Sequence, residues 1–185
     1  MPQKIGFPAG VLGENPLRLD VLAANAPHFV ALDKPAGILL DSYLGSPKGK
    51  SVMLAMRDTP EKPEFKRLGI VSPYAVNQVD FEISGAAVVA CDKDTSVKMR
   101  NAMWSEAMGF QYLLLAKPVK PLEDVFDADL PILMHEERPV WLVSHRFGKK
   151  ARTRFEIVET VGAFQLWRAT TRTVRPHQIR VHANE

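Results

Sequence analysis

The segment YAVNQVDFEISGAAVVAC, residues 74–91, predicts two strands joined by a short turn. The strands are expected over Tyr74–Val79 and Ala86–Cys91, and the turn over Asp80–Gly85. The second strand is almost entirely apolar, so we expect it to be buried on both faces. A turn of this kind can direct a carboxylate into a cleft, although an aspartate in a turn more often hydrogen-bonds its own backbone. Asp80 is therefore a candidate catalytic residue with a simple structural alternative.

Further elements are predicted on both sides of this hairpin. Before it, the pattern indicates a strand at His28–Asp33, a turn at Lys34–Gly37, a helix at Ser51–Asp58 with Ser51 as its N-cap, and an exposed loop at Thr59–Gly69. After it, the pattern indicates a helix from Asp94 to about Met108 with Val97, Trp104 and Met108 facing inward, a strand at Phe110–Ala116, a surface connection at Pro118–Arg138, a hairpin of Arg152–Glu159 and Phe164–Thr170 around Gly162, and a last helix at His177–Ala183.

The order of these elements favours one fold class. Strands and helices do not alternate regularly, which disfavours a doubly wound parallel sheet. We therefore expect an α+β fold with a mixed, mainly antiparallel sheet and flanking helices. Residues 1–27 are expected to form an N-terminal arm, and residues 28–185 to form one domain.

The net charge of +3 is unevenly distributed along the chain. From Arg146 to Arg180 there are nine basic residues and two acids, which gives that stretch a charge of +7 and leaves −4 on the remainder. A basic segment on an otherwise slightly acidic chain suggests a surface that meets a polyanion. A solvated charged face is an equally weighted alternative.

Composition and motifs argue against several classes of function. No run of about 18 apolar residues is present, and residues 1–16 hold too short an apolar stretch for a secretory signal. The single cysteine, Cys91, suits a reducing cytoplasm. There is no phosphate-binding glycine loop and no GxSxG elbow, and the spacing of His177 and His182 matches no usual pair of helical zinc ligands. We therefore expect a cytoplasmic protein with no membrane span, no metal site and no nucleotide cofactor.

Two more segments carry reactive side chains. The first, TRTVRPHQIRVH at residues 171–182, is dense in donors for phosphates, base edges or a carboxylate. Its alternative is the polar start of a helix with solvated charges. The second, FQYLLL at residues 110–115, contains Tyr112, which is either an active-site residue or a core aromatic.

Taken together, these segments resemble the RluA-type pseudouridine synthases in identity, order and separation. The matching motifs are DKPAG at 33–37, NQVDFEISG at 77–85, YLLL at 112–115 and VRPHQIRVH at 174–182. The segment KARTRFE at 150–156 resembles the strand that precedes the family's last motif. The likeness extends from His28 to the C-terminus.

The resemblance implies an enzyme that converts uridine in rRNA or tRNA to pseudouridine, with a basic RNA-binding cleft and no metal or organic cofactor. Asp80 matches the family's catalytic aspartate, the nucleophile that acts at the ribose. Tyr112 matches the tyrosine that lies near the base and helps in proton removal, and Arg175 matches the arginine that pairs with the aspartate. We expect a monomer. RNA contacts are expected from Lys34, Gln78, Lys149, Lys150, Arg152, Arg154, His177, Gln178 and Arg180.

The chain also departs from the family pattern. Gln78 stands where the family has the arginine that enters the RNA in place of the flipped base, Ile83 replaces a threonine, and Val174 replaces a glycine. Family domains continue past the last motif, whereas this sequence stops at Glu185, so we expect a catalytic domain that is incomplete at its C-terminus. The alternative function is therefore a catalytically impaired relative that still binds RNA.

Overall fold

The computed structural model describes residues 3–42, 49–117, 123–138 and 140–185. The chain divides into two compact units, Met1–Asn101 and Ala102–Glu185, each with its own sheet and buried core. The strand pairs of the described residues are antiparallel, and short helices flank the sheets. The predicted α+β class with a mainly antiparallel sheet is thus confirmed. The expected domain boundary at residue 28 stays a prediction.

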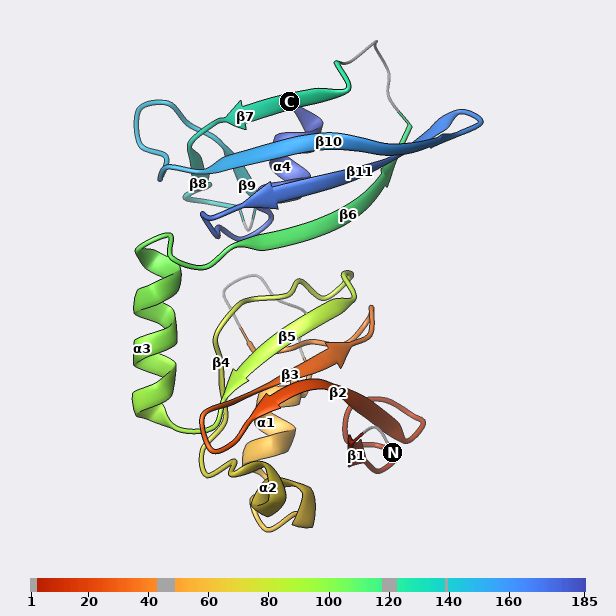
Figure 1. Cartoon of the computed structure of the whole chain (residues 1–185), viewed down its shortest axis with the longest axis vertical. Helices are drawn as coiled ribbons and strands as arrows, with labels where there is room; N and C mark the ends of the chain where they lie inside the picture. Colours follow the sequence, from red (N-terminus) through yellow and green to blue (C-terminus); the bar gives the residue numbers. More distant parts are fainter. Residues whose placement is uncertain (1–2, 43–48, 118–122, 139) are drawn as a thin grey trace. The chain divides into compact units, whose positions relative to one another are not determined.

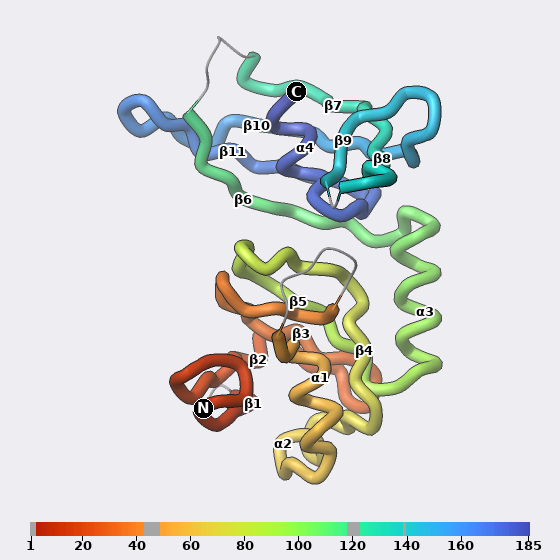
Figure 2. The backbone as a smooth tube through the Cα atoms, turned by 180° about the vertical axis from the view of Figure 1, so that it is seen from behind, coloured from red at the N-terminus to blue at the C-terminus, as the bar shows by residue number. Residues whose placement is uncertain are grey.

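The first unit is built on a five-stranded sheet in the order β1-β2-β3-β5-β4 (Figure 1). The strands are β1 Lys4–Phe7, β2 Leu17–Asn25, β3 Phe29–Lys34, β4 Tyr74–Ala75 and β5 Gly85–Ala90. Helices α1 Val52–Arg57 and α2 Pro63–Leu68 cover one face of this sheet, as Figures 1 and 2 show from opposite sides. Residues 1–27, expected as an arm, supply β1 and β2, whose alternate residues Ile5, Phe7 and Leu19 are buried in the core.

Of these two helices, the sequence predicted α1 but not α2. Ser51 caps α1 as predicted, because its Oγ accepts a hydrogen bond from the Leu54 N–H at 3.1 Å. The exposed loop predicted at Thr59–Gly69 is wrong, because it contains α2. Phe65 and Leu68 on that helix are buried, and this burial outweighs the charged, proline-containing composition of the stretch.

The hairpin around Asp80 is less regular than its sequence suggested. The strand expected over Tyr74–Val79 is reduced to two residues, β4. Beyond it the side chain of Asn77 substitutes for the backbone ladder: its Nδ2 donates to the Ala86 carbonyl at 3.1 Å, and its Oδ1 accepts from the Val88 N–H at 2.8 Å. A side-chain amide thus fixes the start of the Asp80 turn against β5.

Helix α3, Lys93–Trp104, contains the point at which the chain passes from the first unit to the second. Asp92 rather than Asp94 satisfies its start, since the Asp92 carboxylate accepts from the Thr95 N–H at 2.8 Å. The prediction that Val97 and Trp104 face inward is wrong. Both are at least half exposed, and Ser96 and Met103 are buried instead.

The second unit is built on a four-stranded sheet in the order β6-β11-β10-β7, with a two-stranded sheet beside it. The strands are β6 Phe110–Ala116, β7 Val125–Asp129, β8 Ile132–Met134, β9 Trp141–Val143, β10 Arg152–Val161 and β11 Phe164–Thr171. Helix α4, Gln178–Asn184, lies on one face of the larger sheet (Figures 1 and 2). The core on this face centres on Phe155, stacked on Phe126 with ring centroids 5.0 Å apart, and on Trp167.

Two of these strands correct the sequence analysis. The stretch Pro118–Arg138 was expected to be a surface connection, and its residues 118–122 lie outside the described residues. The remainder contains β7 and β8, because Ala128 and Ile132 are buried while Asp127 and Asp129 face outward. Among the described residues, no helix is both long and apolar enough to cross a membrane.

Gly148 tests the packing of the connection between β9 and β10. A Cβ built at Gly148 would lie 2.7 Å from the Pro131 carbonyl carbon and would also meet the Ser144 carbonyl oxygen. We expect Gly148→Ala to lower the free energy of unfolding by roughly 1–3 kcal/mol, because backbone atoms cannot give way cheaply. Chemical denaturation of the variant measures this change. Gly109→Ala is the matched control, since nothing lies within 4 Å of a Cβ there, and equal stability of the two variants would contradict the prediction.

Candidate functional site

The first unit holds the candidate nucleophile. Asp80 is only 8% exposed and begins the turn that leads into β5. The Ile83 N–H closes this turn by donating a hydrogen bond to the Asp80 carbonyl at 3.2 Å. A second turn, DKPAG at residues 33–37, is tied to it. The Gly37 N–H donates to the Phe81 carbonyl at 2.8 Å. Two motifs that lie more than 40 residues apart in sequence therefore form one bonded structure.

Lys34 joins the two turns from the inside. Its side chain is completely buried, and its ammonium donates to the carbonyls of Ile38 at 2.8 Å, Pro35 at 2.9 Å and Phe81 at 3.5 Å. Burial lowers the pKa of Lys34, and the nearby carboxylates of Asp80 and Glu82 oppose that shift. The charge of Lys34 lies beneath the Asp80 turn, where it favours a negative charge on that turn. The predicted contact of Lys34 with RNA stays a prediction.

Gln78 precedes Asp80 by two residues and is partly buried. Its Nε2 is buried, and among the described residues it finds no hydrogen-bond partner. A buried donor without an acceptor costs about 1–3 kcal/mol. No described residue offers a hydrogen bond that would offset the burial of the Gln78 amide. Buried polar groups left without a partner often mark functional sites.

The second unit holds Arg175, which packs against an exposed aromatic residue. Its guanidinium carbon lies 5.3 Å from the centre of the Trp104 ring, a cation–π distance, and its Nη1 donates to the Val174 carbonyl at 2.8 Å. Burial lowers the pKa of Arg175, and the Glu106 carboxylate opposes the shift. Nε of Arg175 is buried and has no partner among the described residues. Trp104 was not predicted to be a neighbour of Arg175, because its side chain was expected to face inward.

Gln178, which was expected to contact RNA, is buried beneath Arg175. Its Oε1 accepts from the Arg175 backbone N–H at 3.1 Å. Its Nε2 lies within hydrogen-bonding distance of three threonine hydroxyls and a carbonyl, those of Thr153, Thr171, Thr173 and Arg152. Gln178 thus holds the loop that carries Arg175 onto strands β10 and β11.

Tyr112 lies on β6, opposite Ala169 of β11, and packs against the core of the second unit. This placement matches the core-aromatic alternative, and it also leaves the residue half-buried rather than sealed in. An active-site role for Tyr112 stays a prediction.

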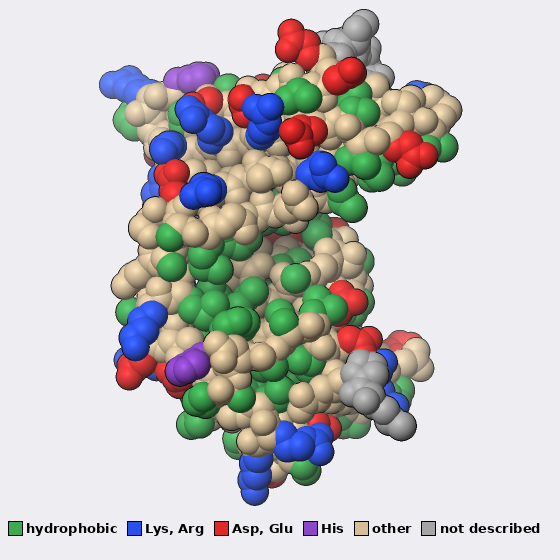
Figure 3. Space-filling model, viewed as in Figure 1, with side chains coloured by type: hydrophobic (Ala, Val, Ile, Leu, Met, Phe, Trp, Pro, Cys, Tyr) green, Lys and Arg blue, Asp and Glu red, His purple; other side chains and the backbone are tan. Residues whose placement is uncertain are grey.

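The predicted basic residues Lys150, just before β10, and Arg152 and Arg154, on β10, are exposed and each pairs with an acid. Lys150 pairs with Glu106 at 2.9 Å, Arg152 pairs with Asp129, and Arg154 pairs with Asp127 at 3.3 Å. Lys149 is exposed in the connection before the strand. Figure 3 shows blue and red side chains interspersed over this unit. The acids come from β7 and from Glu106, which follows α3, so the charge count over Arg146 to Arg180 does not include them.

The two histidines of the last motif, His177 and His182, lie in different surroundings. His177 has a left-handed backbone, with φ of 57°, at the start of α4, and Arg180 contacts it one turn later. His182 is buried, with Nδ1 2.9 Å from the Thr153 hydroxyl and Nε2 2.9 Å from the Leu130 carbonyl. Because a carbonyl only accepts, Nε2 carries the proton and Nδ1 accepts from the hydroxyl. The described residues hold no cluster of three or more His, Cys, Asp or Glu side chains arranged for a metal.

The structure therefore brings the predicted residues together in two groups. Lys34, Gln78 and Asp80 belong to the first unit. The second unit contains the others, namely Tyr112, Lys149, Lys150, Arg152, Arg154, Arg175, His177, Gln178 and Arg180.

Comparison with known proteins identifies a family for this arrangement. The family described as RNA pseudouridylate synthase matches residues 28–185. Ribosomal large subunit pseudouridine synthase D of Nitrosomonas europaea is 28% identical over 155 residues, which cover 84% of this chain and 43% of that protein. The Yersinia pestis protein of the same name is 27% identical over 153 residues, covering 83% of this chain and 45% of its own. The chain thus spans less than half the length of these relatives.

The fold is also that of solved structures. Human RNA Pseudouridylate Synthase Domain Containing 4 superimposes with a TM-score of 0.66 at 18% identity, covering 89% of this chain and 63% of that chain. Human RNA Pseudouridylate Synthase Domain Containing 1 gives a TM-score of 0.65 at the same identity, with 89% and 64% covered. At this identity the likeness concerns the fold alone.

His182 gives a testable pH dependence. Burial lowers its pKa below the ordinary value, so the folded chain resists a proton that the unfolded chain accepts. The stability is therefore complete above about pH 6.5 and falls as the pH drops below that value. We expect urea unfolding at a series of pH values to show this loss, and His182→Asn to flatten it. His145→Asn at an exposed position is the control. An unchanged pH profile in His182→Asn would contradict the assignment of the loss of stability to His182.

Proposed function

The chain belongs to the RNA pseudouridylate synthase family, and we propose that it isomerises uridine to pseudouridine in RNA with Asp80 as the nucleophile. The family match over residues 28–185, which includes all four ordered motifs, carries this proposal. Because the named relatives act on the ribosomal large subunit, rRNA is the proposed substrate, with tRNA as the other candidate. The proposal has the chain working as a monomer in the cytoplasm, without a metal or organic cofactor.

In the proposed reaction, the bond between the ribose C1′ and N1 of uracil breaks, and a bond between C1′ and C5 forms. The base turns between these steps, the proton on C5 leaves and N1 gains a proton, so the product is an isomer. Asp80 acts at the ribose as a carboxylate nucleophile. Arg175 pairs with Asp80, and Tyr112 assists removal of the C5 proton; both roles are proposed from the matching motifs.

The surroundings of Asp80 support the role of nucleophile. A nucleophilic carboxylate must stay ionised in a partly dry pocket, and a nearby positive charge favours the ionised form. The buried Lys34 ammonium supplies such a charge from below the turn.

One observation favours a second candidate, an RNA-binding relative with impaired catalysis. The target uridine must leave its base stack, which costs a few kcal/mol. Gln78 stands in place of the family's arginine and offers an amide without charge. Its side-chain amide nevertheless retains a hydrogen-bond donor, so we place the enzyme ahead of the binding module.

The role of Asp80 is tested by Asp80→Asn. We expect this isosteric change to abolish the release of tritium from carbon-5-labelled uridine in bulk cellular RNA, because an amide is not a nucleophile at the ribose. RNA affinity, measured by filter binding, should change little, since the substitution removes no cation. Equal tritium release from the parent and the variant would remove Asp80 from the mechanism.

The role of Gln78 is tested by Gln78→Arg. If base flipping limits turnover, the arginine should raise the rate of tritium release by stacking better in the vacated space and adding a charge. Gln78→Leu has a similar size without a donor and should lower the rate. Identical rates in all three proteins would place Gln78 away from the flipped base.

A further inference from the structure

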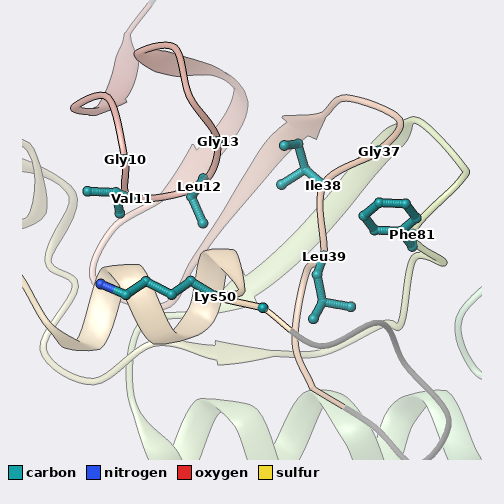
Figure 4. A pocket seen from close by; sticks show the side chains of 10 residues that line it. Gly10, Val11, Leu12, Gly13, Gly37, Ile38, Leu39, Lys50 and Phe81 are labelled. Carbon is teal, nitrogen blue, oxygen red and sulfur yellow. The ribbon is translucent and has the colours of Figure 1, made fainter.

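A hollow of about 350 Å³ lies in the first unit, next to the turn that carries Asp80. Three segments line it (Figure 4): the glycine-containing loop at residues 10–13, residues 37–39 at and after the end of the DKPAG turn, and Phe81, which directly follows Asp80. Gly49 and Lys50 complete the lining. This volume is in the range of pockets that hold small organic ligands.

Hydrogen bonds hold the described walls in place. The loop is closed by the Gly10 N–H, which donates to the Gly13 carbonyl at 2.7 Å. Gly37 is bonded to Phe81, as described above, and the Leu39 carbonyl accepts from the Val52 N–H of α1 at 2.9 Å. The hollow is therefore a built feature of the unit, with walls drawn from segments far apart in sequence.

The chemistry of the lining is apolar with one aromatic ring and one cation. Figure 4 shows the Phe81 ring beside Gly37 and Ile38, and the Lys50 side chain extended toward the side where Gly10 and Val11 lie. Lys50 is the charged side chain among the described lining residues. An aromatic face that stacks a base, combined with a cation that attracts a phosphate, is the pattern by which proteins bind single-stranded nucleic acid.

We propose that this hollow binds one nucleotide of the substrate RNA, a neighbour of the target uridine, with its base on Phe81 and a phosphate at Lys50. The inference rests on the proposed function, because the adjacent Asp80 would engage the target itself. Residues 10–13 lie outside the family match, which begins at residue 28. This loop lines the hollow, so under the proposal it helps to select the target uridine. The selection would then depend in part on residues that the family match does not include.

Gly13 permits a sharp test. Its backbone is not in the left-handed region and nothing lies within 4 Å of a Cβ built on it, so Gly13→Leu adds bulk at a residue that lines the hollow without backbone strain or a clash at Cβ. Gly109→Leu is the matched control, an exposed glycine of the second unit with the same open surroundings. Thermal unfolding should show both variants folded like the parent, and Gly13→Ala provides a smaller obstruction if Gly13→Leu fails to fold.

The direct measurement is photo-crosslinking to single-stranded RNA of random sequence that contains 4-thiouridine, followed by peptide mapping. We expect crosslinks in the peptides that contain residues 10–13 or Phe81. In Gly13→Leu these should fall by about tenfold, the scale set by loss of one base–aromatic stack, and in Lys50→Ala they should also fall. Gly109→Leu should match the parent. Crosslinks that map elsewhere, or that are equal in Gly13→Leu and Gly109→Leu, would overturn the inference.

Tritium release separates this inference from the proposed function. If the parent releases tritium and Gly13→Leu raises KM with kcat nearly unchanged, both stand. If the parent releases none while Gly13→Leu still removes the crosslinks, the hollow binds RNA and the proposed activity fails. If the parent releases tritium and Gly13→Leu changes neither KM nor the crosslinks, the activity stands and the inference about the hollow fails.

Discussion

The buried ammonium of Lys34 is the constraint on which the first unit's candidate site depends. Removing an ammonium from water costs several kcal/mol unless other groups compensate. Here three carbonyls accept its hydrogen bonds, and two carboxylates lie near enough to oppose the shift in its pKa. Those carbonyls belong to the DKPAG turn, the segment after it and Phe81. The charge is therefore tolerable only when both turns are folded, which fixes the backbone of Asp80 and one wall of the hollow together.

In the second unit, a neutral side chain rather than a buried charge fixes the backbone of the candidate site. Gln178 uses a neutral amide to join the loop of Arg175 to threonine hydroxyls on β10 and β11. A fully satisfied polar network of this kind is rigid, because any displaced member leaves a buried group without a partner. Arg175 is thereby fixed at its backbone, while its guanidinium rests on an exposed Trp104 and keeps an unpartnered Nε. The arrangement gives a cation whose backbone and guanidinium are both held in place.

The sequence predicted what depends on neighbouring residues and missed what depends on distant ones. The strand Phe110–Ala116 and the Ser51 cap follow from local periodicity and one side-chain bond, and both predictions are confirmed. Helix α2 was missed because its formation depends on burying Phe65 and Leu68 against the sheet. In the site, the motifs drew attention to Lys34 and Gln178 but gave no sign that both side chains are buried. Their burial follows from partners 47 and 25 residues away, which no local pattern reveals.

The charges of β10 also show that a local count along the sequence misses distant partners, and they bear on the proposed binding of RNA. The count of +7 over Arg146 to Arg180 omits Asp127 and Asp129, which β7 brings beside Arg154 and Arg152. Exposed ion pairs contribute only about 0–1 kcal/mol each, so they do not lock these arginines in place. The acids still repel a phosphate that approaches the same arginine, and fewer counterions are released per contact. For the proposed binding of RNA, the charge that matters at this surface is therefore the charge left after pairing, not the count of +7.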